Sequence, residues 1–356
     1  MNLLNSPALH DLEEIRLHGA GLWPLLEGKR IFISGGTGFF GRWLLEAFHY
    51  LAGIHGLGLS VTVLSRDPER FFQKAPHFRN HARIHFIAGD VGDFVFPEGP
   101  FDYVIHAATE ASTSLQAHQP RVIVDTIVAG TRHMLDFAAQ AETAKFLFVS
   151  SGAVYGRQPP ELSHFPEDYT GAPNPCDPRS AYGEGKRMAE LLCGIASKQH
   201  GLECLIARCF AFVGPYLPLD TQFAVGNFIG NALHGKPVII TGDGTAYRSY
   251  LYPTDLVVWL LTILLRGEPM RPYHVGSDVP VSIAELARLV AGLPQPAIPV
   301  QILGTPKTGA LPERYVPQTR LAQTTMGLEC TVDIKEALRR MWKFYVSAMP
   351  ERSSCL

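Results

Sequence analysis

Three side chains in the middle of the chain could together move a proton on and off an alcohol: Ser151, Tyr182 and Lys186. Tyr182 and Lys186 are four residues apart, so on a helix capped by Ser180 they would share one face. A free tyrosine has a pKa of about 10, and a cation held nearby lowers that pKa by favouring the phenolate. Ser151 could bond to the same oxygen while a hydride moves on the attached carbon. A Tyr-x-x-x-Lys spacing alone also arises by chance, so the interpretation depends on the rest of the chain.

A glycine-rich turn near the N-terminus could hold a dinucleotide. Gly35, Gly38 and Gly41 lie between the apolar run 30–34 and the amphipathic stretch 42–51. Small residues between a strand and a helix let the backbone approach a pyrophosphate, which sits at the positive end of the helix. The residues expected to contact the cofactor here are Gly35, Thr37, Gly38, Phe39, Phe40 and Gly41.

Apolar runs alternate with helical stretches, such as 120–139, through the first half of the chain. The expected strands are residues 30–34, 61–65, 84–88, 103–107 and 146–150. This alternation predicts an α/β fold with a doubly wound parallel sheet of the Rossmann type. Ligands of such sheets bind beyond the carboxyl ends of the strands. Gly35, Asp90, His106 and Ser151 all follow a predicted strand, so the topology would bring them to one edge.

Taken together, these motifs resemble those of the extended short-chain dehydrogenase/reductases, a family of NAD(P)-dependent sugar-nucleotide epimerases, dehydratases and reductases. The resemblance covers about residues 28–345. It is carried by Gly35-x-x-Gly38-x-x-Gly41, Gly89-Asp90-Val91, His106-Ala107-Ala108, Ser150-Ser151-x-x-Val154-Tyr155-Gly156, Tyr182-x-x-x-Lys186, and Arg248 before Tyr252-Pro253-Thr254-Asp255.

The resemblance implies a role for each reactive residue. Tyr182 is expected to be the general acid or base at the reacting hydroxyl. Lys186 is expected to lower the pKa of Tyr182 and to hold the nicotinamide ribose, and Ser151 to orient the reacting oxygen. Further cofactor contacts are expected from Asp90, Val91, Ala107 and Ala108. For Asp90, a plain turn or cap is the alternative.

The resemblance also implies a second, smaller lobe that binds the sugar nucleotide. Its expected contacts are Thr109, Asn227, Arg248 and Arg314. The two arginines are expected at the diphosphate, because a guanidinium can donate two parallel hydrogen bonds to a phosphate. An ordinary surface ion pair is the alternative for either arginine, and more so for Arg314.

The end of the second expected strand indicates which nicotinamide is bound. NAD-specific members of such folds place an acidic residue there to bind the ribose 2′-hydroxyl. Here Ser65 is followed by Arg66, and Arg42 after the glycine turn could add a second cation. An arginine would attract a 2′-phosphate, so the sequence favours NADP(H) over NAD(H) as cofactor. The alternatives are a solvated Arg66 with NAD bound, and an Arg42 that is a surface helix residue.

Several positions depart from the family pattern. Sugar-nucleotide 4,6-dehydratases have an acidic pair, typically Asp-Glu, where this chain has Gly152 and Ala153, and related decarboxylases keep a glutamate there. A hydrogen and a methyl group perform no acid–base chemistry, so elimination of water is disfavoured. Three further differences are Ile127 and Ala211 in place of asparagines and Gln318 in place of an aspartate.

Two reactions remain open. The favoured one is NADPH-dependent reduction at C4 of a keto-deoxyhexose nucleotide, with Tyr182 supplying the proton. The alternative is a sugar-nucleotide C4 epimerase that retains NAD. A non-catalytic NAD(P) sensor is disfavoured because Ser151, Tyr182 and Lys186 are all present.

Composition narrows the possible partners. The net charge of −2 gives no reason to expect nucleic acid or an anionic membrane. The six cysteines form no metal pattern, and with no signal peptide visible we expect no metal and a cytoplasmic protein. The resemblance implies a homodimer, which the apolar helices around Met134 and Met188 would permit.

We expect three regions along the chain. Residues 1–27 form an N-terminal helical extension, and residues 28–210 form the dinucleotide-binding domain. Residues 211–356 form mainly the substrate lobe, except that helices 254–266 and 281–291 return to the dinucleotide-binding domain.

Overall fold

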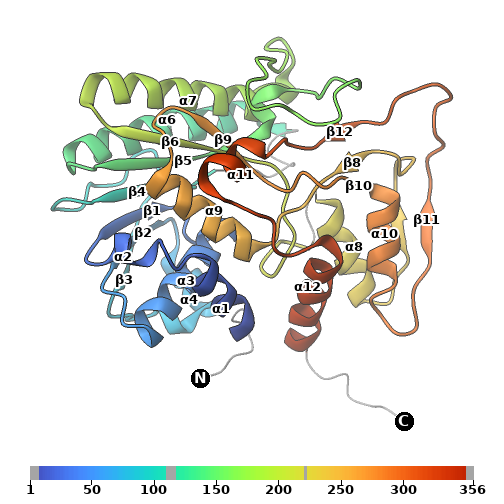
Figure 1. The fold of residues 1–356 in the computed structure, drawn as a ribbon, viewed down its shortest axis with the longest axis horizontal. Helices are drawn as coiled ribbons and strands as arrows, with labels where there is room; N and C mark the ends of the chain where they lie inside the picture. The colour runs from blue at the N-terminus through green and yellow to red at the C-terminus, as the bar shows by residue number, and fades with distance from the viewer. Residues whose placement is uncertain (1–7, 110–117, 220–222, 350–356) are drawn as a thin grey trace.

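A seven-stranded parallel sheet forms the centre of the computed structural model, which describes residues 8–109, 118–219 and 223–349 (Figure 1). The strand order is β3-β2-β1-β4-β5-β6-β9. The strands are β1 (Arg30–Ser34), β2 (Ser60–Ser65), β3 (Ile84–Ala88), β4 (Tyr103–His106), β5 (Lys145–Ser151), β6 (Glu203–Cys209) and β9 (Pro272–Val275). The predicted doubly wound α/β fold is therefore confirmed.

Helices cover both faces of this sheet because successive strand residues point to opposite sides. In β5, Leu147 and Val149 face the core shared with α3 (Phe39–Ile54) and α9 (Pro253–Arg266). Phe146 and Phe148 face the other core. That second core is covered by α6 (Pro120–Gln140) and α7 (Ala181–His200). The middle of each central strand is consequently apolar, as expected of a sheet buried on both faces.

The described part of the N-terminal extension, residues 8–27, is mainly helical; residues 1–7 lie outside the described part of the chain. It contains α1 (Leu9–His18) and the short α2 (Trp23–Leu26). Leu12 and Ile15 of α1 are buried in the core that α3 and α9 share. The extension therefore packs on the main domain.

The smaller lobe is built around short strands beside the sheet (Figure 1). One group has β8 (Tyr247–Arg248) between β10 (Val281–Ser282) and β12 (Arg314–Tyr315), and the other pairs β7 (Val238–Ile240) with β11 (Val300–Ile302). The lobe's helices are α8 (Ala224–Leu233), α10 (Ile283–Ala291) and α12 (Ile334–Ala348). Shorter elements elsewhere are α4 (Pro68–Lys74), η2 (Pro76–Phe78), η3 (Gly152–Tyr155), η4 (Pro178–Ser180) and α11 (Arg320–Met326).

One boundary differs from the sequence prediction. Residues 254–266 do return to the main sheet, as α9, but the expected helix at 281–291 does not. This helix, α10, buries Leu286 and Val290 in the core of the smaller lobe. A capping box between Ser282 and Glu285 starts α10 directly after β10, which holds it in that lobe.

Candidate functional site

The glycine turn lies pressed against the end of β4. Gly35 has a φ of +75°, and a Cβ built on it would lie 2.5 Å from the backbone of Ala107 and Ala108. A Cβ on Gly41 would lie 2.2 Å from the Cα of Gly36. Only glycine fits both places. The turn leads into the 16-residue helix α3, whose first backbone N–H groups can receive an anion.

At the start of α3, the backbone and not the side chains would contact a bound phosphate. Thr37 and Gly38 are exposed. The rings of Phe39 and Phe40 pack against Phe212, with centroids 6.3 and 4.8 Å from it. Contacts from Phe39 and Phe40 to a phosphate would therefore come from their N–H groups.

The end of β2 offers one arginine rather than two. Ser65 is buried and its hydroxyl accepts a bond from Asp67 N, while Arg66 is exposed. Arg42 is 5% exposed, and its Nε lies 2.7 Å from Glu46. Its guanidinium also stacks 4.6 Å from the ring of Tyr216. Both expectations for Arg42 are wrong, because its ion pair and stacking hold it inside the protein.

The ends of β3 and β4 complete the cofactor edge. The Asp90 carboxylate accepts from Gly92 N at 3.0 Å, which closes a turn, and Val91 is buried. Ala107 and Ala108 follow His106, whose ring bonds Ser34 Oγ at 2.7 Å. Burial lowers the pKa of His106 to about 3, so this ring is neutral and supports the strand ends.

The catalytic residues meet where β5 ends. Ser151 closes β5, and its Oγ accepts a hydrogen bond from Ala153 N at 3.1 Å. A Cβ on Gly183 would lie 2.6 Å from Ala153 O, so α7 packs directly against η3. This contact brings the Tyr182 side chain close to that of Ser151.

The expected cap on α7 is wrong. Ser180 stands at the cap position, but its backbone is already helical and the described residues give its side chain no capping bond. The carboxylate of Asp177 instead accepts from Arg179 N and caps the short η4 just before α7.

Lys186 is buried one turn along α7 from Tyr182, at 2% exposure. Its Nζ donates to Thr109 Oγ1 at 2.6 Å and to Val149 O at 2.7 Å. Nζ also lies 4.7 Å from the ring centroid of Phe148 and 6.0 Å from that of Tyr182. Burial lowers the pKa of Lys186 to about 8.

The expected fall in the pKa of Tyr182 does not occur in the protein alone. Burial raises the pKa of Tyr182 to about 12, although the nearby Ser151 hydroxyl offsets part of this increase. The ammonium of Lys186 is held by Thr109 and Val149 instead of the phenol. Tyr182 therefore carries its proton at neutral pH and is ready to donate it.

Of the two arginines expected in the smaller lobe, only Arg248 lies on the side that carries Tyr315. Arg248 and Tyr315 are register partners in the parallel pair β8–β12, as are Tyr247 and Arg314. Side chains alternate along a strand, so Arg248 and Tyr315 face one side. Arg314 faces the other side, where its guanidinium stacks 4.4 Å from the Tyr247 ring. Asn227 is exposed on α8.

Sequence analysis missed Tyr315. A Cβ on Gly152 would lie 2.7 Å from the Tyr315 hydroxyl and 2.7 Å from the ring of Phe210. The Tyr315 hydroxyl therefore lies beside the end of β5 that carries Ser151. The sequence signal was indirect: a glycine stood where the resemblance implies an acidic side chain in 4,6-dehydratases, which left space for a residue from elsewhere.

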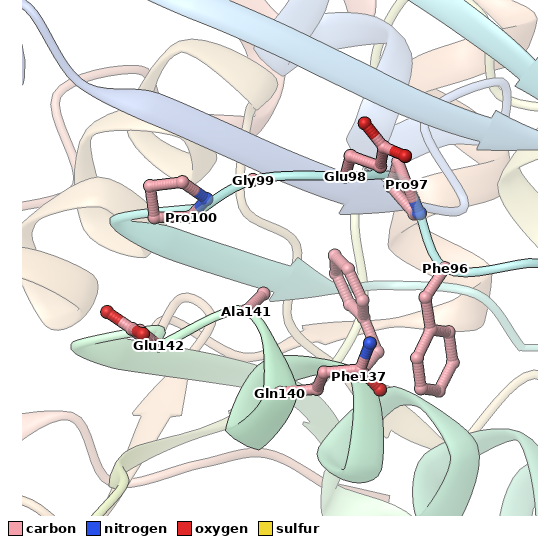
Figure 2. Close-up of a pocket in the computed structure, with 9 residues that line it drawn as sticks. All are labelled: Phe96, Pro97, Glu98, Gly99, Pro100, Phe137, Gln140, Ala141 and Glu142. Atoms are coloured by element: carbon pink, nitrogen blue, oxygen red, sulfur yellow. The ribbon is translucent and has the colours of Figure 1, made fainter.

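One pocket lies away from the catalytic residues. Figure 2 shows this pocket, of about 340 Å³, lined by residues 96–100, Phe137 and residues 140–142. It lies before the starts of β4 and β5, at the sheet edge opposite Ser151. Within the described residues, no group of three or more His, Cys, Asp or Glu side chains could hold a metal ion. No helix in the same part of the chain is long and apolar enough to cross a membrane.

Comparison with known proteins places this site in a family. Residues 31–276 match the NAD dependent epimerase/dehydratase family. UDP-glucuronic acid decarboxylase 1 of Danio rerio is 32% identical over 317 residues, covering 89% of this chain and 72% of the relative. UDP-glucuronic acid decarboxylase 3 of Arabidopsis thaliana is 33% identical over 313 residues, covering 88% and 87%.

Solved structures show the same fold. UDP-glucose 4-epimerase of Thermotoga maritima, solved with UDP-glucose, has a TM-score of 0.75 at 21% identity, covering 90% of this chain and 100% of that one. dTDP-glucose 4,6-dehydratase of Streptomyces venezuelae, solved with NAD, has a TM-score of 0.75 at 23% identity, covering 89% and 97%. The chain therefore belongs to the NAD-dependent epimerase/dehydratase family, the sugar-nucleotide enzymes among the extended short-chain dehydrogenase/reductases that its motifs resemble.

Proposed function

We propose that this enzyme reduces a keto group at C4 of a nucleotide-activated deoxyhexose, with NADPH as the reductant and Tyr182 as the proton donor. The observation that carries the proposal is the position of Tyr182, whose helix α7 packs on η3 and so brings Tyr182 to Ser151 at the end of β5, one helical turn from Lys186. Burial raises the pKa of Tyr182 to about 12, so its hydroxyl is protonated at neutral pH and can act as an acid. Ketone reduction consumes one proton at the oxygen, and Tyr182 lies beside Ser151 where such an oxygen would bind.

The proposed step balances in protons and electrons. When bound, NADPH would supply a hydride to the carbonyl carbon, and the C=O electron pair would move to the oxygen. Tyr182 would give its proton to that oxygen, so the product would be an alcohol and Tyr182 would be left as a phenolate. Ser151 lies beside that phenolate, and the Lys186 ammonium, 6.0 Å from the ring centroid, would favour it electrostatically.

Elimination and decarboxylation fit this site less well. The relatives' names assign decarboxylation of UDP-glucuronic acid to them, and the sequence resemblance implies acidic residues at positions 152 and 153 in dehydratases and a glutamate in that place in decarboxylases, whereas this chain has Gly152 and Ala153. Here position 152 is glycine, and the Tyr315 hydroxyl and the Phe210 ring occupy the space its side chain would enter. An acidic residue could not be accommodated there without moving both rings.

The proposed preference for NADP(H) depends on one residue. Arg66 is exposed at the end of β2, beside the buried Ser65, and could bind a ribose 2′-phosphate. Because Arg42 is paired with Glu46, it adds no second cation. A charge reversal at Arg66 should therefore weaken NADPH binding and leave NADH binding nearly unchanged.

A C4 epimerase with retained NAD is the second candidate. One observation favours it: with Arg42 engaged by Glu46, only Arg66 argues for the 2′-phosphate. The same Ser151, Tyr182 and Lys186 would serve, with Tyr182 first acting as a base. A positively charged nicotinamide beside Tyr182 would lower its pKa and so permit that first step.

We also propose a homodimer that uses the exposed face of α7 and α6. Met188, Leu191 and Ile195 are exposed along one side of α7, and Val122 is exposed on α6. Two such faces packed together would bury these side chains, as in a four-helix bundle.

The free thiols of the described cysteines support a reducing, cytoplasmic location.

Mass spectrometry of nucleotides released from the purified protein would first test whether the bound cofactor is NADP(H) or NAD(H). Turnover would then be measured as NADPH oxidation with a panel of 4-keto and unmodified sugar nucleotides. We expect one mole of NADPH consumed per mole of 4-keto sugar reduced. Tyr182→Phe should lower kcat by about 10²–10⁴-fold while NADPH still binds. Sugar interconversion without net NADPH consumption would instead establish the epimerase.

A further inference from the structure

A carboxylate lies one helical turn beyond Lys186 on α7. It belongs to Glu190, and residues four apart on a helix share one face. The Lys186 ammonium donates to Val149 O at 2.7 Å. Glu190 Oε1 accepts from the hydroxyl of the next strand residue, Ser150, at 2.5 Å. Helical side chains lean toward the N-terminus of their helix, so Glu190 leans toward the turn that carries Lys186. The two charged groups therefore lie against adjacent residues of β5.

In the described part of the chain, Glu190 is paired with Arg208 of β6 and not with Lys186. Arg208 Nε lies 3.0 Å from Glu190 Oε1, and Arg208 Nη2 lies 2.6 Å from Oε2. This two-point geometry is the strong form of an arginine–carboxylate pair. The side chains of Arg208 and Glu190 are only 15% and 13% exposed, so little water competes with the pair.

Arg208 is held from its other side by a chain of directed hydrogen bonds. Gln318 O can only accept, so His274 Nδ1, at 2.7 Å, carries the hydrogen. Burial lowers the pKa of His274 to about 3, so the ring is neutral and its Nε2 accepts from the Tyr155 hydroxyl at 2.6 Å. The Tyr155 oxygen is left to accept from Arg208 Nη1 at 2.7 Å. The guanidinium is thus fixed against Glu190 by partners that carry no charge.

A Glu190 carboxylate without Arg208 would be drawn to Lys186. The acidic groups that act electrostatically on Lys186 include Cys193, Cys209 and Glu190. Burial raises the pKa of both thiols, so they are uncharged at neutral pH. Glu190 is the ionised member, and a buried carboxylate needs a compensating cation. An ion pair with Glu190 would take the Lys186 ammonium away from the phenol and the ribose.

We propose that Arg208 is a positioning residue that keeps Glu190 from pairing with Lys186, so that the ammonium stays available for catalysis. This inference deepens the proposed function and rests on it for the role of Lys186 in the reaction. Two cations compete for one carboxylate. Arg208 binds it more strongly because its planar fork engages both oxygens, whereas an ammonium acts as a point charge.

The two halves of the pair should respond differently when each is removed. Arg208→Met releases a carboxylate beside Lys186, so we expect kcat to fall by at least about tenfold. Glu190→Gln breaks the same ion pair but leaves nothing that can capture an ammonium, so kcat should stay within about threefold of the wild type. Equal losses in the two variants, with kcat measured per folded molecule, would overturn the proposal, because the pair would then only support the fold.

A double variant, Arg208→Met with Glu190→Gln, adds a rescue. It leaves no charge of the pair buried without a partner, so it should fold even if Arg208→Met does not. We expect its kcat to return to near the wild-type value, because no carboxylate is left to capture Lys186. A folded double variant whose kcat stays about tenfold below the wild type would refute the proposal, because Arg208 would then act other than through Glu190.

Arg340→Met provides the matched control. It also removes an arginine that holds carboxylates, those of Asp11 and Glu14, but these lie on α1. Its kcat should stay near the wild-type value. A fall in kcat equal to that of Arg208→Met would assign both effects to general loosening of the fold and would overturn the proposal.

A second measurement needs no substrate and so separates this inference from the proposed function. Isotope labelling at lysine Cε lets NMR follow the pKa of each ammonium, and Lys186→Met identifies the Lys186 signal. The wild-type pKa of Lys186 should be about 8. Pairing with Glu190 should raise that pKa in Arg208→Met, and adding Glu190→Gln should lower it again.

The pKa of Lys186 decides the inference whichever reaction the enzyme catalyses. If that pKa does not rise in Arg208→Met, the role of Arg208 is refuted. If it rises but no 4-keto sugar is reduced, the proposed reaction fails and the inference stands.

Discussion

Two cations in this protein, the buried Lys186 and the partly buried Arg340, have opposite surroundings. Lys186 in the catalytic corner is held by two neutral oxygens, Thr109 Oγ1 and Val149 O. Arg340 on α12 is held by three carboxylates: Asp11 and Glu14 of α1 and Glu336 of its own helix. Burial lowers the pKa of Lys186 to about 8, whereas at Arg340 the hydrogen bonds of Glu14 and Glu336 outweigh burial and raise the pKa.

The difference separates a structural cation from a functional one. At Arg340 the neighbouring carboxylates neutralise the charge, so the group joins α1 to α12. At Lys186 the charge has no hydrogen-bonded carboxylate among the described residues, so it remains available to a phenolate or a ribose hydroxyl. A protein tolerates such an uncompensated buried charge mainly where function requires it.

Lys186→Met should show the largest effect. The change keeps most of the side-chain volume and removes the charge beside Tyr182. We expect kcat to fall by about 10²–10³-fold, as when an oriented active-site donor is removed. The free energy of unfolding at pH 7 should change by no more than about 1 kcal/mol, because the lost hydrogen bonds are offset by relief of a desolvated charge. A large loss of stability with little loss of kcat would contradict the comparison.

Arg340→Met should give the reverse pattern. Asp11 is 2% exposed and would lose its cation, so we expect the free energy of unfolding to fall by about 3 kcal/mol. The kcat of the folded variant should remain near that of the wild type. Arg339→Met is the control, because Arg339 is exposed and pairs with Glu336 on the same helix. That control should change stability by less than about 0.5 kcal/mol.

The stability contributed by Lys186 should depend on pH in a predictable direction. In the unfolded chain its pKa is near 10.5, and in the folded protein it is about 8. Between these values the unfolded state binds more protons, so stability rises with pH, by at most about 1.4 kcal/mol per unit. Denaturant titrations of wild type and Lys186→Met should therefore diverge from pH 8 to 10.5, with the wild type gaining. Parallel curves would show that Lys186 titrates normally.

Tyr252→Phe should give the smallest effect. The Tyr252 hydroxyl donates to Asp11 Oδ2 at 3.0 Å, while Asp11 keeps its ion pair with Arg340. We expect a loss of about 1 kcal/mol of unfolding free energy, the value of one hydrogen bond, and no change in kcat. A loss as large as that of Arg340→Met would mean that the hydroxyl, and not the guanidinium, holds the Asp11 carboxylate.

Sequence predicted the main sheet well because its signals are local. The strand expected at 84–88 has the same bounds as β3, and the helix expected at 120–139 is α6 within one residue. Long apolar runs and glycine spacing fix such elements without knowledge of distant partners. Ser151, Tyr182 and Lys186 were found for the same reason, since each belongs to a short motif on one of these elements.

The smaller lobe was less predictable for the opposite reason. Strands β8 and β12 have two residues each, too few for a periodic pattern, and their pairing decides that Tyr315 and not Arg314 faces Ser151. The direction of the Tyr182 pKa shift was also missed, because it depends on how much protein surrounds the ring. Neither the pairing of short strands nor the burial of a side chain can be predicted from the residues next to it in the sequence.

The ion cluster at Arg340 has a consequence for biosynthesis. Asp11 emerges from the ribosome 329 residues before the guanidinium that will neutralise it. The first helix can condense on α3 early, but its carboxylate must stay hydrated until α12 has been translated. We therefore expect docking of this helix to be completed only late in maturation, once α12 can supply the guanidinium.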